Sequence, residues 1–171
     1  MMRRLARRMR YGRFFAMGIV GVLGSLLNAG PLVSAQSLSR TTIVGPGFSC
    51  EINAQTPHFS KWWWTRKNQY KVDTKGDGSC TDPADELQAQ ATLYYAAYIG
   101  LSGYWVAANP SPIATVYNKS SIQTGQSYTG CEYLSTNEYY GTAILWVNGG
   151  PPQDSPIAGP VSVECIPPQT A

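Results

Sequence analysis

"LQAQATLYYAAYI" (residues 87–99) is the stretch that decides the fold. Apolar side chains occupy every second position in it: Leu87, Ala89, Ala91, Leu93, Tyr95, Ala97 and Ile99. An uninterrupted period of two predicts a long β-strand with one buried face. The preceding "DPADE" (82–86) is instead typical of a helix start, and several alanines favour helix. A helix over 82–99 therefore stays open as the alternative, and we favour the strand.

Shorter strand candidates lie on both sides of this stretch, separated by turn-forming residues. They cover residues 41–44, 48–54, 68–74, 104–108, 113–119, 138–148 and 161–165. We expect a turn at 75–80, a hairpin loop at 100–103, and loops at 121–130 and 149–160. About seven to nine short strands joined by turns predict an all-β fold, a single antiparallel β-sandwich that is immunoglobulin-like in general architecture.

Residues 1–35 have the features of a secretory signal peptide. Six arginines and no acid precede an apolar run of about 14 residues, and "VSA" (33–35) ends the segment ahead of Gln36. The run is shorter than the roughly 20 residues that a spanning helix needs, although an uncleaved membrane anchor is the alternative. We therefore expect a signal peptide at 1–35, a β-sandwich domain at 36–171, and a secreted, extracellular protein.

The basic charge of the whole chain belongs to this leader. Of the 13 Lys and Arg residues, six lie within residues 1–35, which contain none of the 10 acids. Residues 36–171 therefore hold seven cations and ten acids, a formal charge of −3. Because nucleic acid and anionic membranes bind basic surfaces, we expect no nucleic-acid partner, and no membrane partner after signal cleavage.

The four cysteines are Cys50, Cys80, Cys131 and Cys165, and all follow the leader. An even number in a secreted chain predicts two disulfides, and no C-x-x-C pair suggests zinc, so we expect no metal site. We prefer Cys50–Cys80 with Cys131–Cys165, which closes two local loops, each stabilising by about 3–4 kcal/mol. The nested alternative, Cys50–Cys165 with Cys80–Cys131, would tie the first strand to the last and stays open.

The motif C-x6-P-H-x-S occurs as "CEINAQTPHFS" (50–60), and Cys80, "LYY" (93–95), "GYW" (103–105) and "YYGTA" (139–143) follow it. In this order the segments resemble a loose group of small secreted all-β proteins of Gram-positive bacteria, most of them uncharacterised, over residues 48–148. The resemblance implies secretion, a sandwich and Cys50–Cys80 pairing, and it carries no established activity or catalytic residue. "KWWWTRKNQ" (61–69) replaces a small Gly/Ser-rich link of that group, and the second cysteine pair is additional.

The tryptophan-rich segment 61–67 is the candidate binding site. Its candidate residues are Lys61, Trp62, Trp63, Trp64, Arg66 and Lys67, and Lys71 and Lys75 extend the basic patch. If the segment is a strand, successive side chains point to opposite faces, so at least one tryptophan should be exposed or lie under a loop. An exposed tryptophan beside cations is typical of sugar platforms and protein hot spots. Alternatively, the tryptophans cover the edge of the sandwich and the cations form a solvated face.

We predict no catalytic residue. His58 is the only histidine, and a nucleophilic triad would also need an activated Ser or Cys, for which no motif is present. We expect the His58 ring to pack at a loop and to hydrogen-bond a backbone carbonyl. "DTKGDG" (73–78) departs from a calcium loop, because Lys75 takes a ligand position. Three acidic residues at 82, 85 and 86 leave carboxylate chemistry open as an alternative.

These observations predict a secreted extracellular binding protein whose contact surface lies between Trp62 and Lys75. Its partner would be a protein or a cell-surface polysaccharide, and we expect no cofactor. Two alternatives stay open, namely a small secreted hydrolase that uses carboxylates and a structural component of a cell envelope or particle.

Overall fold

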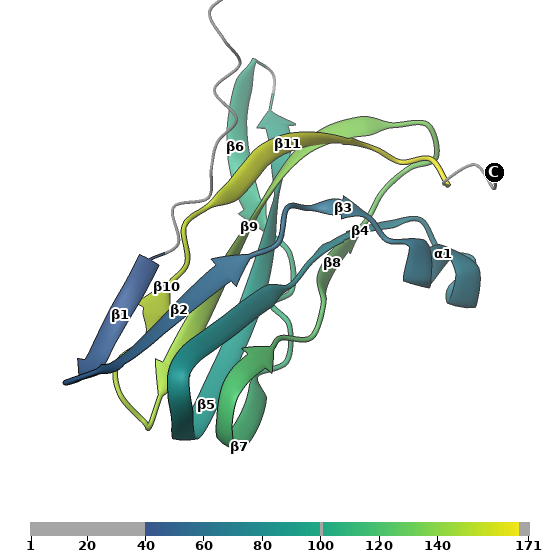
Figure 1. The fold of residues 1–171 in the computed structure, drawn as a ribbon. Helices are drawn as coiled ribbons and strands as arrows, with labels where there is room; N and C mark the ends of the chain where they lie inside the picture. Colours follow the sequence, from purple (N-terminus) through teal and green to yellow (C-terminus); the bar gives the residue numbers. More distant parts are fainter. Residues whose placement is uncertain (1–39, 100, 168–171) are drawn as a thin grey trace, which may run out of the picture. The chain divides into compact units, whose positions relative to one another are not determined.

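The computed structural model describes residues 40–99 and 101–167, which form antiparallel β-strands and one short helix (Figure 1). The signal peptide expected at 1–35 lies outside the described residues. The elements in chain order are β1 (Arg40–Gly45), β2 (Phe48–Ala54), β3 (His58–Phe59), α1 (Lys61–Lys67), β4 (Lys71–Thr74), β5 (Gly76–Ile99), β6 (Ser102–Ala107), β7 (Ala114–Gln123), β8 (Ser127–Gly130), β9 (Thr136–Val147), β10 (Gln153–Asp154) and β11 (Ala158–Glu164).

β5 is the central strand of the larger sheet, and it is 24 residues long. Its first part pairs with β2 on one edge and with β7 on the other, and the pairing with β7 shifts register between Ser79 and Ala84. Its later part pairs with β9, and its end pairs with β6. The strand predicted at 87–99 is therefore confirmed, and it begins already at Gly76 (Figure 1).

The two parts of β5 belong to opposite layers of a β-sandwich, as glycine packing shows. A Cβ added at Gly76 would lie 2.6 Å from the Cβ of Ala143 in β9, and one added at Gly78 would lie 3.2 Å from Leu145 Cδ1. The expected turn at 75–80 is wrong, because close approach between the layers, rather than chain reversal, requires these glycines. The core between the layers comprises Cys50, Ile52, Ala84, Leu87, Ala89, Ile122, Ala143, Leu145 and Val147.

A smaller sheet, with strand order β3-β4-β8, packs on the later part of β5 and on β9. Val72 of β4 forms a second buried cluster with Leu93 and Tyr139, and burial raises the pKa of Tyr139. The loop expected at 121–130 is wrong in part, because it contains the end of β7 and all of β8. Hydrophobic periodicity missed β8 because Tyr128 at its centre is exposed rather than buried.

Two disulfides, Cys50–Cys80 and Cys131–Cys165, confirm the preferred pairing. The first joins directly paired positions of β2 and β5. The second joins the segment after β8 to the residue that follows β11. Two disulfides are typical of proteins that fold outside the reducing cytosol.

Candidate functional site

The tryptophan-rich segment forms the helix α1, which corrects the strand geometry assumed for it. Ser60 precedes the helix with an extended backbone, and Asn68 ends it in the left-handed conformation at φ 50°. The backbone N–H of Asn68 donates to the Trp64 carbonyl, and that of Gln69 donates to the Trp63 carbonyl, which closes the last turn. The helix has only seven residues and none of them is buried, so tertiary contacts rather than propensity must hold it.

A buried carboxylate fixes the chain at the start of α1. Asp73 of β4 is buried, and the Oγ–H of Ser60 donates to its Oδ2 over 2.7 Å. The Ser60 hydroxyl is therefore directed to the sheet and makes no cap to the helix. Oδ1 makes no aligned hydrogen bond, and the Nε2 of His58 lies 3.3 Å from it. Because one carboxylate contacts residues of both β3 and the helix start, it holds α1 against β4.

His58 lies beside this carboxylate and is exposed. Its Nδ1–H donates to the carbonyl oxygen of Thr56 over 3.1 Å, which confirms the expected backbone hydrogen bond. The neighbour that sequence reasoning missed is Asp73. Histidine and Ser60 each contact the carboxylate rather than one another, whereas a nucleophilic triad needs a serine–histidine hydrogen bond. The arrangement supports positioning of α1, not nucleophilic catalysis.

The three tryptophans have different surroundings. Trp62 is 48% exposed, and its ring meets that of Trp63 edge-on at 4.9 Å between centroids. Trp63 is partly buried and also packs against Tyr128 of β8 at 4.7 Å. Trp64, likewise partly buried, packs against Tyr70 at 4.9 Å. The expectation that at least one tryptophan is exposed holds, and the exposed one is Trp62.

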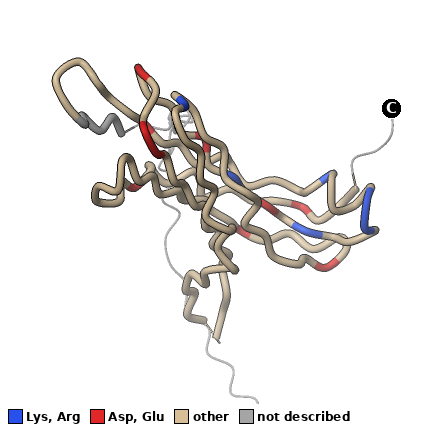
Figure 2. Tube along the Cα trace, turned by 90° about the horizontal axis from the view of Figure 1, so that it is seen from below, with Lys and Arg blue, Asp and Glu red and all other residues tan. Residues whose placement is uncertain are grey.

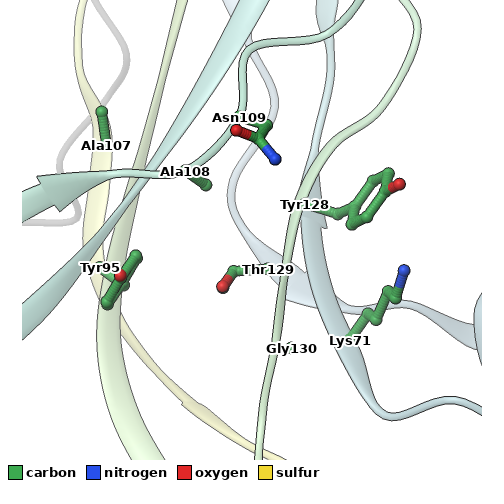
Figure 3. Close-up of a pocket in the computed structure, with 8 residues that line it drawn as sticks. All are labelled: Lys71, Tyr95, Ala107, Ala108, Asn109, Tyr128, Thr129 and Gly130. Carbon is green, nitrogen blue, oxygen red and sulfur yellow. The ribbon is translucent and has the colours of Figure 1, made fainter.

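Lys71 is held between two rings. Its Nζ lies 3.6 Å from the centroid of Trp63 and 3.9 Å from that of Tyr128. Figure 3 shows Lys71 and Tyr128 extending together on one side of β8, while Thr129 points to the other side, toward Tyr95. Burial lowers the pKa of Lys71, and the negative faces of the two rings offset part of that cost. The ammonium therefore contacts both rings and holds them together.

A second group of rings continues the surface beside α1. Tyr70, between α1 and β4, contacts Trp64, Phe59 of β3 and Tyr133 of the loop before β9. Tyr133 is exposed, and Cys131 ties its loop to β11. We define the aromatic end as α1 together with Tyr70, Lys71, Tyr128 and Tyr133.

Three cations of the aromatic end are exposed. They are Lys61, Arg66 and Lys67 of α1. Within residues 45–99 and 101–167, whose side chains the structure describes, the contact between His58 and Asp73 is the only one found between a basic and an acidic side chain, so these three cations make no ion pair there. Figure 2 shows Lys and Arg gathered at the end of the trace that carries α1, while Asp and Glu are spread along the strands. Trp62 and Arg66 are one helical turn apart, so they share one face of α1.

The carboxylates considered for calcium have protein partners. Asp73 accepts from Ser60, and the two carboxylate oxygens of Asp77 accept from the side-chain amides of Gln55 and Gln123. No group of three or more His, Cys, Asp or Glu able to hold a metal occurs in the part of the chain that the structure describes. The acidic residues at 82 and 85 are exposed on β5, and Glu86 accepts from Gln88.

Four residues of the aromatic end were missed or misread from sequence. Tyr70, Tyr128 and Tyr133 carried no signal, because they come together only through the pairing of β4 with β8 and the loop after it. Lys71 was read as part of an open basic patch, and it is instead clamped. The position of Lys71 beside Tyr128 of β8 could be found only from the strand register, which pairs Lys71 with Gly130.

No protein-family model matches the chain, and no curated protein is similar enough in sequence to indicate a family or an activity. Among the described residues, no helix is long and apolar enough to cross a membrane.

Proposed function

We propose that the protein is a secreted extracellular binding protein and that the aromatic end is its contact surface. The partner we favour is an acidic cell-surface polysaccharide. The observation that carries the proposal is the exposed Trp62, beside Arg66 and within a group of cations that make no ion pair with the side chains that the structure describes.

The tryptophan and the cations supply complementary parts of such a contact. A sugar ring presents an apolar C–H face and polar edges, and an exposed indole provides a flat apolar surface for that face. Carboxylates or sulfates on the polymer would pair with Lys61, Arg66 and Lys67, none of which has to break an internal ion pair first. Binding would therefore start with little electrostatic cost to the protein.

The surface is also fixed in place before a ligand arrives. Trp63 supports the edge of Trp62, and Lys71 and Tyr128 in turn support Trp63. Asp73 holds the start of the helix through Ser60. A platform that is ordered in advance loses less side-chain entropy on binding than a flexible one.

Affinity electrophoresis and calorimetry with polygalacturonate and with uncharged dextran test the proposal. We expect retardation by the acidic polymer, weakened by added salt, and little retardation by dextran. Trp62→Ala and the triple variant Lys61→Gln/Arg66→Gln/Lys67→Gln should each reduce affinity by about tenfold or more. Lys119→Gln, an exposed cation on β7, is the matched control and should bind as the parent does.

Equal binding of the two polymers would contradict the acidic partner. Unchanged binding by Trp62→Ala would remove the aromatic end as the contact surface. If neither polymer binds while a protein from the surroundings of the cell is captured only when Trp62 is intact, the surface stands and the partner is a protein.

A further inference from the structure

The hairpin formed by β5 and β6 ends in exposed apolar side chains. Tyr98 and Ile99 end β5, Leu101 lies in the connection, and Tyr104 and Trp105 belong to β6. All five are exposed, Ile99 by 72% and Leu101 completely. In Figure 1 the joined ends of β5 and β6 stand beyond the other labelled strands at the top of the view. We call these five residues the hairpin tip.

Both faces of the hairpin carry apolar groups near the tip. Directly paired positions of two strands share a face, and so do residues two apart on one strand. Trp105 pairs with Ala96, which is two residues from Tyr98, so Tyr98 and Trp105 lie on one side of the hairpin. Ile99 and Tyr104, which pair with Ser102 and Ala97, lie on the other. A protein that docks on a sheet covers one face, whereas this tip is apolar all round. Such a distribution fits a surrounding medium rather than a single docked surface.

Charge is absent from the hairpin. No Asp, Glu, Lys, Arg or His occurs in residues 87–118, which include all of β6. Two carboxylates share pockets with Tyr98 of the tip, namely Glu138 of β9 and Glu132 of the loop before β9, whereas Lys71 lines a pocket with Ala107 at the far end of β6. The tip can therefore leave water without burying a charge, and the two nearby carboxylates disfavour an anionic surface.

Ring contacts join the hairpin to the body of the sandwich. Tyr94 of β5 stacks on Tyr140 of β9 at 4.5 Å between centroids, and Trp105 meets Tyr140 edge-on at 4.7 Å. Burial and the neighbouring Tyr94 raise the pKa of Tyr140. The side-chain amide of Asn137 donates to the carbonyl of Ala96, just beyond the last β5–β9 pair. The tip is thus presented on a supported strand pair.

We infer that the hairpin tip inserts into the interfacial layer of a zwitterionic lipid bilayer. The aliphatic residues Ile99 and Leu101 enter deepest, and the aromatic residues Tyr98, Tyr104 and Trp105 lie closer to the surface of the bilayer. Aliphatic groups favour hydrocarbon, and Tyr and Trp favour the level of the headgroups, so the order along the hairpin matches that of a membrane surface.

The length of the hairpin limits how deep it reaches. From Leu101 to Trp105 there are four residue steps, about 13 Å at the rise of a strand. With Trp105 among the headgroups, the aliphatic tip reaches about 5–10 Å into the boundary of the acyl chains. Glu138 then stays outside the hydrocarbon, and the outer backbone edges of the tip, where β5 no longer pairs with β9, lie in the hydrated headgroup layer.

The net charge of the chain predicted no membrane partner, but that expectation concerned basic surfaces, and this contact depends on apolar groups.

Flotation of the protein with phosphatidylcholine vesicles is the first test. We expect the protein to float with them, to float no better when phosphatidylglycerol is added, and to keep floating in high salt. Leu101→Asp should lower the partition coefficient by at least about tenfold, because an aspartate must be dehydrated at the tip. Leu134→Asp, an exposed leucine in the loop before β9, is the matched control and should float as the parent does.

Quenching of tryptophan emission by brominated phosphatidylcholine locates the contact. Trp105→Phe should abolish the quenching, whereas Trp62→Phe should keep it, which also separates this inference from the proposed role of the aromatic end. Failure of the parent to float, equal flotation of Leu101→Asp, or quenching that depends on Trp62 would each overturn the inference. Self-association lost in Leu101→Asp without any flotation of the parent would also overturn it, and would assign the tip to a second copy of the chain.

Discussion

The core between the sandwich layers and the aromatic end are held together in different ways. In the core, β5 meets β9 at glycine, alanine and leucine, and an added methyl group would overlap a neighbour at 2.6 Å. At the aromatic end, rings contact one another at 4.7 to 5.3 Å around a clamped ammonium and a buried carboxylate. The first region tolerates no added volume, and the second depends on a few polar contacts. We therefore expect that an enlarged side chain destabilises the core and that the loss of a polar group destabilises the aromatic end.

Gly76→Ala should give the largest effect. The new Cβ would lie 2.6 Å from Ala143 Cβ and 3.2 Å from Thr124 Cγ2, so strands of opposite layers must separate. We expect a loss of about 3 kcal/mol in the free energy of unfolding, measured by urea denaturation.

Gly130→Ala in β8 is the matched control for this prediction. No atom lies within 4 Å of the position that its Cβ would take, so we expect a change below about 0.5 kcal/mol. Equal losses in the two variants would show that the packing contrast between the regions does not govern stability.

Asp73→Asn should have the next largest effect, by removing the buried negative charge that accepts from Ser60 and faces His58. Hydrogen bonds to charged groups are worth about 1.5–3 kcal/mol, so we expect a loss of about 2 kcal/mol. Glu51→Gln is the comparison, because Glu51 accepts a hydroxyl from Ser79 in an exposed setting. Its loss should stay below about 0.5 kcal/mol, and a larger loss than that of Asp73→Asn would refute the assignment of Asp73 as the main polar contact.

Lys71→Met should have the smallest effect, a change below about 1 kcal/mol near neutral pH, because the lost contact of the ammonium with two rings is opposed by relief of the burial that lowers its pKa. Lys61→Met, at an exposed site, should change stability little. Chemical denaturation at a series of pH values checks both variants.

The pH dependence follows from the lowered pKa of Lys71. Below its ordinary value of 10.5, the unfolded chain keeps the proton while the folded chain begins to release it, so the stability of the parent rises with pH in that window. Lys71→Met lacks this rise, and the tyrosines are common to both proteins. The free energy of unfolding of the parent minus that of Lys71→Met should therefore rise as the pH approaches 10.5. A fall in this difference would show that the rings, and not burial, dominate the surroundings of the ammonium.

Much of the fold could be predicted from local pattern. The alternation from Leu87 to Ile99 predicted β5 because this face of the strand is buried from Leu87 to Leu93, although the same pattern continues to Ile99, which is exposed. The even number of cysteines predicted two disulfides, and the closure of two local loops favoured the pairing that is present. The pattern failed at Gly76 and Gly78, since glycine is typical of turns and only the opposite layer explains its presence within a strand.

The candidate site could be predicted only in part. The exposure of one tryptophan and the surface cations follow from composition, because so many large and charged groups cannot all be buried. The helix was missed, since its seven residues carry no buried face and no side-chain cap. Asp73, 13 residues from Ser60, was considered as a possible metal ligand rather than as the contact that holds the helix.

The sequence by itself determined the class of the fold, the number of disulfides and the segment that carries the unusual chemistry, because these depend on periodicity, counting and composition. Only the tertiary structure decided which tryptophan is exposed, that Lys71 is clamped rather than free, and that the apolar hairpin tip stands exposed. The place of Lys71 depends on the register of β4 with β8, two strands that are distant in the chain. The exposure of Trp62 depends on the helix α1, and that of the tip on the end of β5–β9 pairing at Tyr95. A shift of one residue in a strand reverses every side chain on it, so no local pattern contains that information.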